Sequence, residues 1–203
     1  MYRAYMKRFL DIVLSLAGVI VLAIPMLLIA AIVRLDSPGP VLFWQRRVGI
    51  HKVCFMMPKY RTMHINTPHD VPTHLLSNPD QWITRVGRML RRMSLDELPQ
   101  ILCILTGKMS VIGPRPALWN QYDLLAERDK YGANDIRPGL TGWAQINGRD
   151  ELPIGEKARY DGEYVKHMSF LFDCKCFFGT VGAVLRHDGV REGAEKPKEL
   201  AKR

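Results

Sequence analysis

The sequence lacks the common signatures of phosphate-binding and hydrolytic enzymes. Its 203 residues contain no Walker A loop, no GxGxxG fingerprint, no HExxH, no GxSxG and no internal repeat. These absences argue against a P-loop, a dinucleotide-binding turn, a helical zinc site and a serine-hydrolase elbow. Any chemistry that the chain performs must therefore come from other motifs.

Cysteine is also scarce, with only Cys54, Cys103, Cys174 and Cys176. Cys174 and Cys176 lack a matching second pair, which argues against a structural zinc site. All four residues lie in apolar or mixed surroundings, as expected of reduced thiols in a core. The sequence gives no sign of a secreted disulfide scaffold.

Basic residues outnumber acidic ones. The 29 Lys and Arg against 20 Asp and Glu give a formal charge of +9. This balance favours anionic partners such as phosphates, nucleic acid or an acidic membrane surface. The length fits one medium domain with a core of its own.

One long apolar run stands near the N-terminus. Residues 12–33 carry no charge, and their 22 positions meet the length criterion for a transmembrane helix. A signal peptide is disfavoured because the run is too long for its apolar region, and Arg34-Leu35-Asp36 offers no small-residue cleavage site. The chain is therefore predicted to be membrane-bound.

Pro25 divides this run and favours a re-entrant helix over a spanning one. Proline removes a backbone hydrogen bond and kinks or breaks a helix. The uninterrupted half before it, residues 12–24, would be only ~20 Å long, short of a ~30 Å bilayer core. Lys and Arg flank both ends of the run, which fits a segment that enters and leaves on one face. A Pro-kinked spanning helix stays open as the alternative.

The remainder of the chain is predicted to form short elements. After a break at 37–40, residues 41–49 and 52–63 are typical of a β-hairpin, although Pro58 weakens the second strand. Further predictions are a loop over 66–80, helices over 82–93, 101–105 and 160–186, and a mobile tail. The predicted domains are an anchor at 1–36, a catalytic domain at 37–190 and the tail at 191–203.

Two of these helices have faces that suit a membrane surface. Arg85, Arg88 and Arg92 share one face of the helix over 82–93, where they are either solvated or in contact with phosphates and lipid headgroups. The apolar helix over 160–186 is interrupted by Asp173 and Lys175, so it suits a core or interfacial position better than a second span.

Two adjacent carboxylates, Asp96 and Glu97, admit two interpretations. Ser94 and Glu97 have the spacing of a capping box, which would make the acids an ordinary helix start. Pro99 disfavours a helical conformation at the residue before it, so the helix is also compatible with a start near Pro99. In that case both acids lie at its mouth, available for chemistry.

Arg115 lies between Pro114 and Pro116. Such a rigid turn holds the guanidinium at low entropic cost and suits a phosphate ligand. A structural turn with an exposed arginine would have the same sequence.

Four ordered motifs together resemble a known family. They are Lys59–Met63, Ser94–Gln100, Val111–Pro116 and Arg137–Arg149. With the proline-interrupted anchor they resemble the bacterial sugar transferases, monotopic polyprenyl-phosphate phosphoglycosyl transferases, from the anchor to about Val190. The chain looks like the minimal catalytic form. Met57-Pro58 departs from the phenylalanine-rich strand more frequent in the family, which questions the strand geometry but not Lys59.

The resemblance implies an α+β, mostly helical fold with a re-entrant membrane helix, a short β-hairpin and interfacial amphipathic helices around the active site. It implies transfer of a sugar 1-phosphate from a UDP-sugar to undecaprenyl or another polyprenyl phosphate, with UMP released. The product would begin an O-antigen, capsule, exopolysaccharide or glycoprotein glycan that downstream glycosyltransferases extend. The expected location is the cytoplasmic face of the bacterial inner membrane, with membrane lipid as a partner.

Site residues follow from the same resemblance. Asp96 would be the nucleophile that forms an aspartyl-phosphosugar, and Glu97 would act with it in catalysis and in binding Mg²⁺. Helix-mouth N–H groups and Arg91 or Arg92 would keep Asp96 ionised. The phosphate ligands would be Lys59, Arg91, Arg115 and Arg92, with Pro114 and Pro116 in the nucleotide-sugar loop. Arg61 and Asp161 are further candidates.

Three other functions are compatible with parts of the sequence. A membrane-tethered basic protein that binds nucleic acid or anionic lipid would explain the charge but leave the Asp-Glu pair and the Pro-Arg-Pro turn unused. A glycosyltransferase that releases UDP and a scaffold subunit without activity are two others. Our preferred interpretation includes no nucleic-acid partner. The sugar is unspecified, with a lean towards an N-acetylated or amino-modified UDP-hexose, and a homodimer is compatible with the sequence.

Overall fold

The computed structural model describes residues 2–67, 81–148 and 152–186. It is mostly helical, with one antiparallel hairpin and one short parallel strand pair. The prediction of an α+β, mostly helical fold is thus confirmed. The proposed tail at 191–203 and most of the predicted loop at 66–80 lie outside the described residues.

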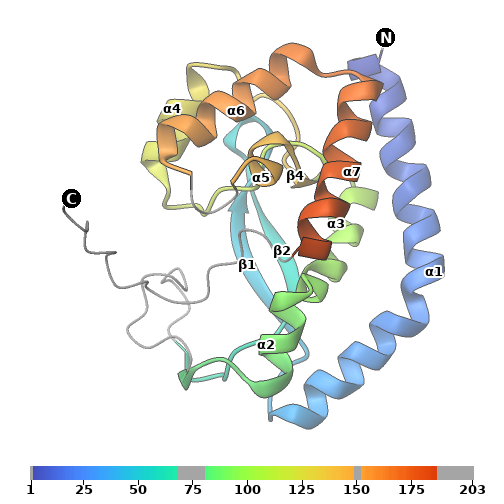
Figure 1. The fold of residues 1–203 in the computed structure, drawn as a ribbon. Coiled ribbons are helices and arrows are strands. Elements are labelled where there is room, and N and C mark those ends of the chain that lie inside the picture. The colour runs from blue at the N-terminus through green and yellow to red at the C-terminus, as the bar shows by residue number, and fades with distance from the viewer. Residues whose placement is uncertain (1, 68–80, 149–151, 187–203) are drawn as a thin grey trace, which may run out of the picture.

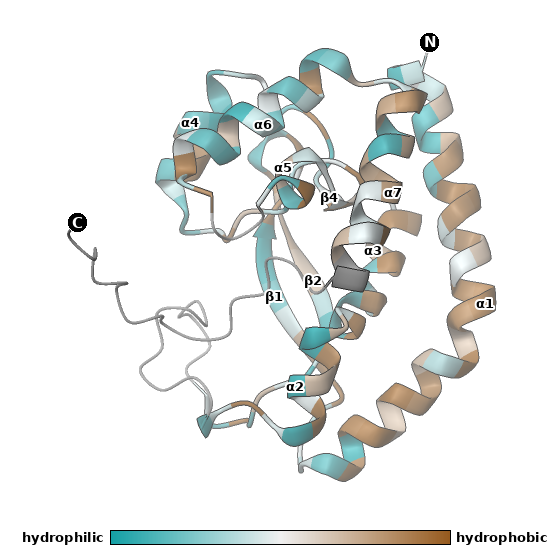
Figure 2. Ribbon diagram, in the orientation of Figure 1, coloured by the Kyte–Doolittle hydropathy of each residue, from teal (hydrophilic) through white to brown (hydrophobic). Residues whose placement is uncertain are grey.

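A single long helix dominates the N-terminal part. After a π-helical turn at Tyr2–Met6, α1 runs over Lys7–Asp36 and is long and apolar enough to cross a membrane. Only 6% of the most apolar 18-residue stretch of α1 is buried, and Figure 2 shows that the helix is largely apolar along its length. Pro25 does not end the helix; Figure 1 shows instead that α1 bends along its course.

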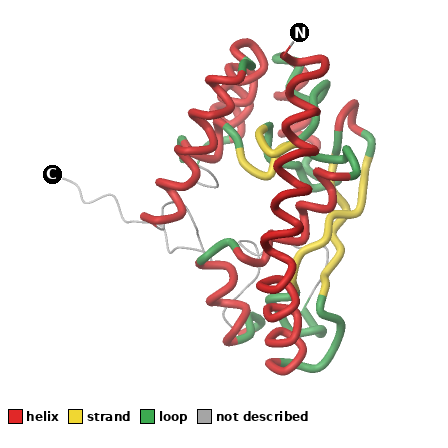
Figure 3. Tube along the Cα trace, turned by 90° about the vertical axis from the view of Figure 1, so that its right-hand side faces the viewer, coloured by secondary structure: helices red, strands yellow, loops and turns green. Residues whose placement is uncertain are grey.

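Both arms of α1 pack on the same domain. Near Pro25, the Tyr60 hydroxyl donates to the Met26 carbonyl at 2.7 Å. Further on, Val33 is 2% exposed and lies in a core cluster with Tyr60 and Leu90. The first turns contact α3 and β3, described below, and Figure 3 shows α1 passing over one face of the domain. The helix is therefore attached to the domain on either side of its bend.

The predicted hairpin is confirmed. β1 (Leu42–Val48) pairs antiparallel with β2 (Cys54–Tyr60), from Leu42 opposite Tyr60 to Val48 opposite Cys54. A 3₁₀ turn at Ile50–Lys52 joins them. β2 continues through Pro58, which is tolerated because each strand of a two-stranded sheet has a free edge. Lys59 therefore keeps a regular strand position.

Three consecutive helical segments follow Thr84. α2 covers Arg85–Arg92, shorter than predicted because Thr84 caps it, its hydroxyl accepting from the Gly87 N–H at 2.9 Å. A 3₁₀ segment at Leu95–Gln100 then leads directly into α3 (Ile101–Leu105), which ends before Gly107 as predicted.

The C-terminal half contains the elements that sequence reasoning missed. β3 (Ser110–Ile112) and β4 (Gly139–Thr141) form a parallel pair, with α4 (Tyr122–Asp129) between them in the chain. Gly139 is required at this approach, since a Cβ there would lie 2.1 Å from the Gly113 nitrogen.

Three more helices complete the part of the fold that the structure describes. α5 covers Trp143–Ile146, α6 Ile154–His167 and α7 Phe170–Arg186. The predicted single helix over 160–186 is therefore wrong in detail, because the chain leaves the helical conformation at Met168. Phe170, Leu171 and Phe178 on α7 are exposed, so an interfacial position for this helix stays a prediction.

Candidate active site

The Asp-Glu pair lies in the 3₁₀ segment between α2 and α3. Ser94 precedes it in a left-handed conformation (φ 55°), and its side chain makes no capping hydrogen bond. The Glu97 side chain contacts two cations rather than the Ser94 backbone. The capping-box interpretation is therefore wrong, and the alternative of acids placed at the mouth of a helix fits the structure.

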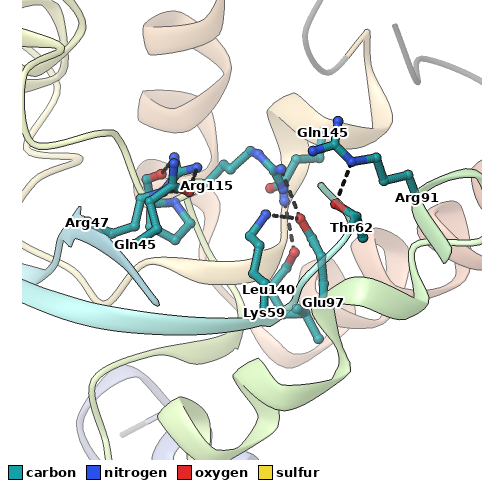
Figure 4. Close-up of polar contacts among 10 residues, drawn as sticks. Gln45, Arg47, Lys59, Thr62, Arg91, Glu97, Arg115, Leu140 and Gln145 are labelled. Atoms are coloured by element: carbon teal, nitrogen blue, oxygen red, sulfur yellow. Dashed lines mark hydrogen bonds and ion pairs between the residues drawn. The ribbon is translucent and has the colours of Figure 1, made fainter. Parts of the chain in front are cut away.

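Glu97 is the centre of a charged cluster (Figure 4). Its Oε1 accepts from Lys59 Nζ at 2.9 Å and from Arg115 Nη2 at 3.0 Å. The Glu97 side chain is 11% exposed and that of Lys59 15%. One carboxylate thus joins the end of β2 to the turn that follows β3.

Burial and charge act against each other on Asp96. Burial raises the pKa of Asp96 above its ordinary value. The neighbouring Lys59 opposes this rise in pKa most strongly, and Arg91 and Arg115 oppose it as well. Burial also lowers the pKa of Lys59, while Glu97 counteracts that change. The ionised form of Asp96 therefore depends on the surrounding cations. Lys59 is one of these cations, in addition to Arg91, which the sequence had suggested for this role.

Arg91 and Arg92 differ in their placement. The Arg91 Nε donates to the Thr62 hydroxyl at 2.8 Å, which holds the guanidinium beside the Glu97 cluster in Figure 4. Arg92 is exposed on α2 together with Arg85 and Arg88. The structure therefore brings Arg91 to the site and leaves Arg92 at the surface.

The Pro-Arg-Pro turn is fixed on both sides of Arg115. The Pro114 carbonyl accepts from the Gly139 N–H at 2.8 Å, and the Pro116 carbonyl accepts from Arg47 Nη1 at 2.9 Å. Gln45 in turn accepts from Arg47. The turn is therefore held by β4 and β1, in agreement with the rigid geometry that the two prolines suggested.

Sequence reasoning missed several residues that surround this cluster. Gln45 and Arg47 lie in β1, where nothing marks them as polar partners of a distant turn, whereas Thr62 follows β2 inside the Lys59–Met63 motif. The Gln145 side chain donates to the Leu140 carbonyl at 3.0 Å, and its buried Oε1 has no hydrogen-bond partner within the described residues. Its position within the Arg137–Arg149 motif was the available signal.

Comparison with known proteins identifies the family. The model of the bacterial sugar transferase family matches residues 2–187. The chain belongs to this family. Sugar transferase EpsL of Bacillus subtilis is 37% identical over 188 residues, which cover 92% of this chain and 91% of that protein.

Two longer relatives carry more specific names. The UDP-glucose:undecaprenyl-phosphate glucose-1-phosphate transferase of Escherichia coli is 42% identical over 184 residues, covering 87% of this chain and 39% of that protein. The UDP-N-acetylgalactosamine-undecaprenyl-phosphate N-acetylgalactosaminephosphotransferase of Aeromonas hydrophila is 34% identical over 194 residues, covering 93% and 45%. The chain thus spans less than half the length of these two relatives.

The two further candidates of this sugar transferase have structural partners. Arg61 donates to the Ser37 hydroxyl at 2.6 Å and to the Pro40 carbonyl at 2.6 Å, and so braces the turn after α1. Asp161 forms a buried ion pair with Arg128 at 2.7 Å between α4 and α6. A direct part of either residue in the reaction stays a prediction.

The donor set of the sugar transferase is compatible with Mg²⁺. Within 2–67, 81–148 and 152–186, no three His, Cys, Asp or Glu side chains cluster as a complete metal cage. Mg²⁺ characteristically uses one or two protein carboxylates and completes its shell with water and substrate phosphates. Asp96 and Glu97 are such a pair, so they are the residues that would hold the ion.

Proposed function

We propose that this chain transfers a sugar 1-phosphate from a UDP-sugar to a polyprenyl phosphate, such as undecaprenyl phosphate, and releases UMP. The observation that carries the proposal is the Glu97 carboxylate, which joins Lys59 and Arg115 next to Asp96. A carboxylate nucleophile set among cations suits an attack on a diphosphate, since two anions must approach each other. The names of the Escherichia coli and Aeromonas relatives support the same reaction class.

In the first step, a carboxylate oxygen of Asp96 attacks the β-phosphorus of the UDP-sugar. A bond forms between this oxygen and phosphorus, and the bond from phosphorus to the bridging oxygen breaks. That oxygen keeps the electron pair and leaves as part of UMP. The enzyme then carries the sugar phosphate as a mixed anhydride on Asp96.

In the second step, a phosphate oxygen of the polyprenyl phosphate attacks the same phosphorus. The acyl-phosphate bond breaks, its electron pair returns to Asp96, and a polyprenyl diphosphate sugar is formed. The nucleophile is thereby regenerated for another turnover. Downstream glycosyltransferases would extend the membrane-held product.

Each cation of the cluster would neutralise part of the negative charge of the substrates. Arg115 presents a rigid guanidinium that can bind a phosphate through two N–H groups, whereas Lys59 supplies a compact charge. Arg91, held by Thr62, is placed to reach a second phosphate. When bound, Mg²⁺ would neutralise the diphosphate and withdraw charge from the reacting phosphorus.

The test is UMP release from a panel of UDP-sugars with undecaprenyl phosphate and Mg²⁺. The panel includes UDP-glucose and UDP-N-acetylgalactosamine, because relatives are named for each, and an amino-modified UDP-hexose. We expect UMP, dependent on both lipid and donor, from at least one sugar. Release of UDP instead would replace the proposal by ordinary glycosyl transfer. A protein that bound DNA in a salt-sensitive way and released no nucleotide would favour the nucleic-acid alternative.

We also propose that α1 is re-entrant, so that the protein is monotopic on the cytoplasmic face of the inner membrane. The support is the bend in α1, the basic residues before and after it, and its attachment to one domain by Arg8 and Asp11 before the bend and by Met26 and Val33 after it. In this arrangement both arms of α1 contact one domain, so the N-terminus would stay on the same side of the bilayer as that domain.

Thiol labelling in intact spheroplasts tests this topology. Arg3→Cys and His51→Cys, both at exposed positions, are made separately after Cys54 and Cys174 are replaced by Ser. We expect both variants to be protected from an impermeant reagent and labelled after permeabilisation. Labelling of Arg3→Cys alone in intact spheroplasts would establish a spanning helix.

A further inference from the structure

The first two turns of α1 contact α3, the helix that follows directly on the segment with the Asp-Glu pair. Arg8 donates from Nη1 to the Ile104 carbonyl at 2.6 Å and from Nη2 to the Leu105 carbonyl at 2.9 Å. These are terminal carbonyls of α3, and a cation suits this helix end; the Ile104 carbonyl also accepts from the Gly107 N–H at 3.0 Å. Because α3 continues directly from the 3₁₀ segment of Asp96 and Glu97, Arg8 fixes the far end of that unit.

One turn later, Asp11 contacts the segment that carries Arg115. It is 4% exposed, and its Oδ1 accepts from the Ser110 hydroxyl and from the Val111 N–H, each at 2.9 Å. Both donors lie at the start of β3, which runs straight into Gly113, Pro114 and Arg115. Asp11 therefore fixes the origin of the strand whose end presents the guanidinium.

These contacts are specific and strong for a helix that faces lipid elsewhere. A buried carboxylate is costly unless hydrogen bonds satisfy it, so the two donors determine where β3 can lie. Ser15, one turn further along, is equally buried, but its hydroxyl donates to the Ile12 carbonyl within α1. Burial alone therefore does not make a contact between α1 and the site.

We propose that Arg8 and Asp11 are positioning residues that set the placement of Glu97 relative to Arg115. The two residues join the Asp-Glu segment and the Pro-Arg-Pro turn to one rigid helical stretch of α1. Seating of the membrane helix on the domain thus becomes a condition for the Glu97–Arg115 ion pair and for diphosphate binding. The kinetic part of this proposal rests on the proposed function.

Asp11→Ala is the variant that tests it, with Asp11→Asn as rescue and Ser15→Ala as the matched control. Loss of two buried hydrogen bonds should raise the KM for the UDP-sugar by about tenfold, with a smaller effect on kcat, because Arg115 binds the donor. Asn keeps an acceptor oxygen and should restore most of the affinity. Ser15→Ala should stay within about twofold of wild type. A lower kcat with an unchanged KM would mean a merely structural role and overturn the proposal.

A double-mutant cycle with Arg115→Ala identifies the path of the effect. If Asp11 acts through Arg115, then Asp11→Ala should change KM by less than about twofold once the guanidinium is absent. An equal effect in both backgrounds would show that Asp11 acts elsewhere and would overturn the proposal.

Hydrogen exchange of the peptide over 109–116 gives a readout that needs no activity. The Val111 N–H should exchange at least about tenfold faster in Asp11→Ala than in wild type, and its exchange rate should be unchanged in Ser15→Ala. Unchanged exchange in Asp11→Ala would overturn the coupling whatever the kinetics. If exchange is faster in Asp11→Ala but the wild-type protein itself releases no UMP, the proposed function is refuted and the coupling of α1 to β3 still stands.

Discussion

Asp96→Asn should abolish sugar-phosphate transfer and the covalent adduct together. The amide has almost the same shape as the carboxylate, but it is not a nucleophile towards phosphorus. We expect UMP release to fall by roughly 10⁴-fold or more, as when the nucleophile of a covalent enzyme is removed. Because Asp96 lies in a segment fixed by α3, the fold of the variant should be unaffected.

Intact mass distinguishes this loss from any other defect. Wild type and Asp96→Asn are incubated with Mg²⁺ and the active UDP-sugar, without lipid acceptor, and wild type alone should gain the mass of the sugar phosphate. Asp135→Asn is the matched control, since that side chain is 68% exposed. An adduct on Asp96→Asn would place the nucleophile elsewhere. UMP release without any wild-type adduct would establish direct transfer to the lipid.

The structure gives a physical reason for the different roles that we propose for the two acids. Glu97 Oε1 is the acceptor for both Lys59 and Arg115, so this oxygen holds the two cations in place. Within the part of the chain that the structure describes, Asp96 forms no ion pair of this kind, yet the same cations lower the cost of its charge. One carboxylate therefore organises the cluster, while its neighbour is the better candidate for attack.

The parts of the site that were predictable lie in contiguous motifs. Asp96 and Arg115 each stand beside unusual prolines in a short stretch, so the sequence draws attention to them without any knowledge of packing, whereas Lys59 was named through the resemblance of its motif to the family. The hairpin and the apolar helix were predictable for a similar reason, because their hydrophobic patterns are local.

The parts that were missed depend on contacts between distant segments. Nothing near Asp11 shows that its partners lie about 100 residues away, in a strand of three residues. A capping box at Ser94 was one of two open interpretations, because its sequence spacing is the same whether or not the backbone permits the cap. Short strands such as β3 and β4 have no periodicity to read, since parallel pairing at a close glycine approach defines them.

The buried pair of Asp161 and Arg128 provides the largest expected effect on stability. Their side chains are 2% and 4% exposed, and two guanidinium nitrogens donate to one Asp161 oxygen. Asp161→Asn would leave the guanidinium buried without its counter-charge, which should lower the free energy of unfolding by about 3–5 kcal/mol. The double variant Arg128→Met/Asp161→Leu should lose less, because no charge is then left unpaired in the core.

Thermal unfolding in detergent, read together with activity per folded molecule, decides between structure and catalysis at Asp161. The exposed Glu127–Lys130 pair on the same helix end is the control, and Glu127→Gln should cost less than about 1 kcal/mol. If Asp161 is structural, the folded fraction of Asp161→Asn should retain a wild-type kcat and KM at low temperature. A variant as stable as wild type but unable to release UMP would make Asp161 part of the reaction site. The first outcome is expected, because the carboxylate is enclosed between α4 and α6 with Arg128 as its partner.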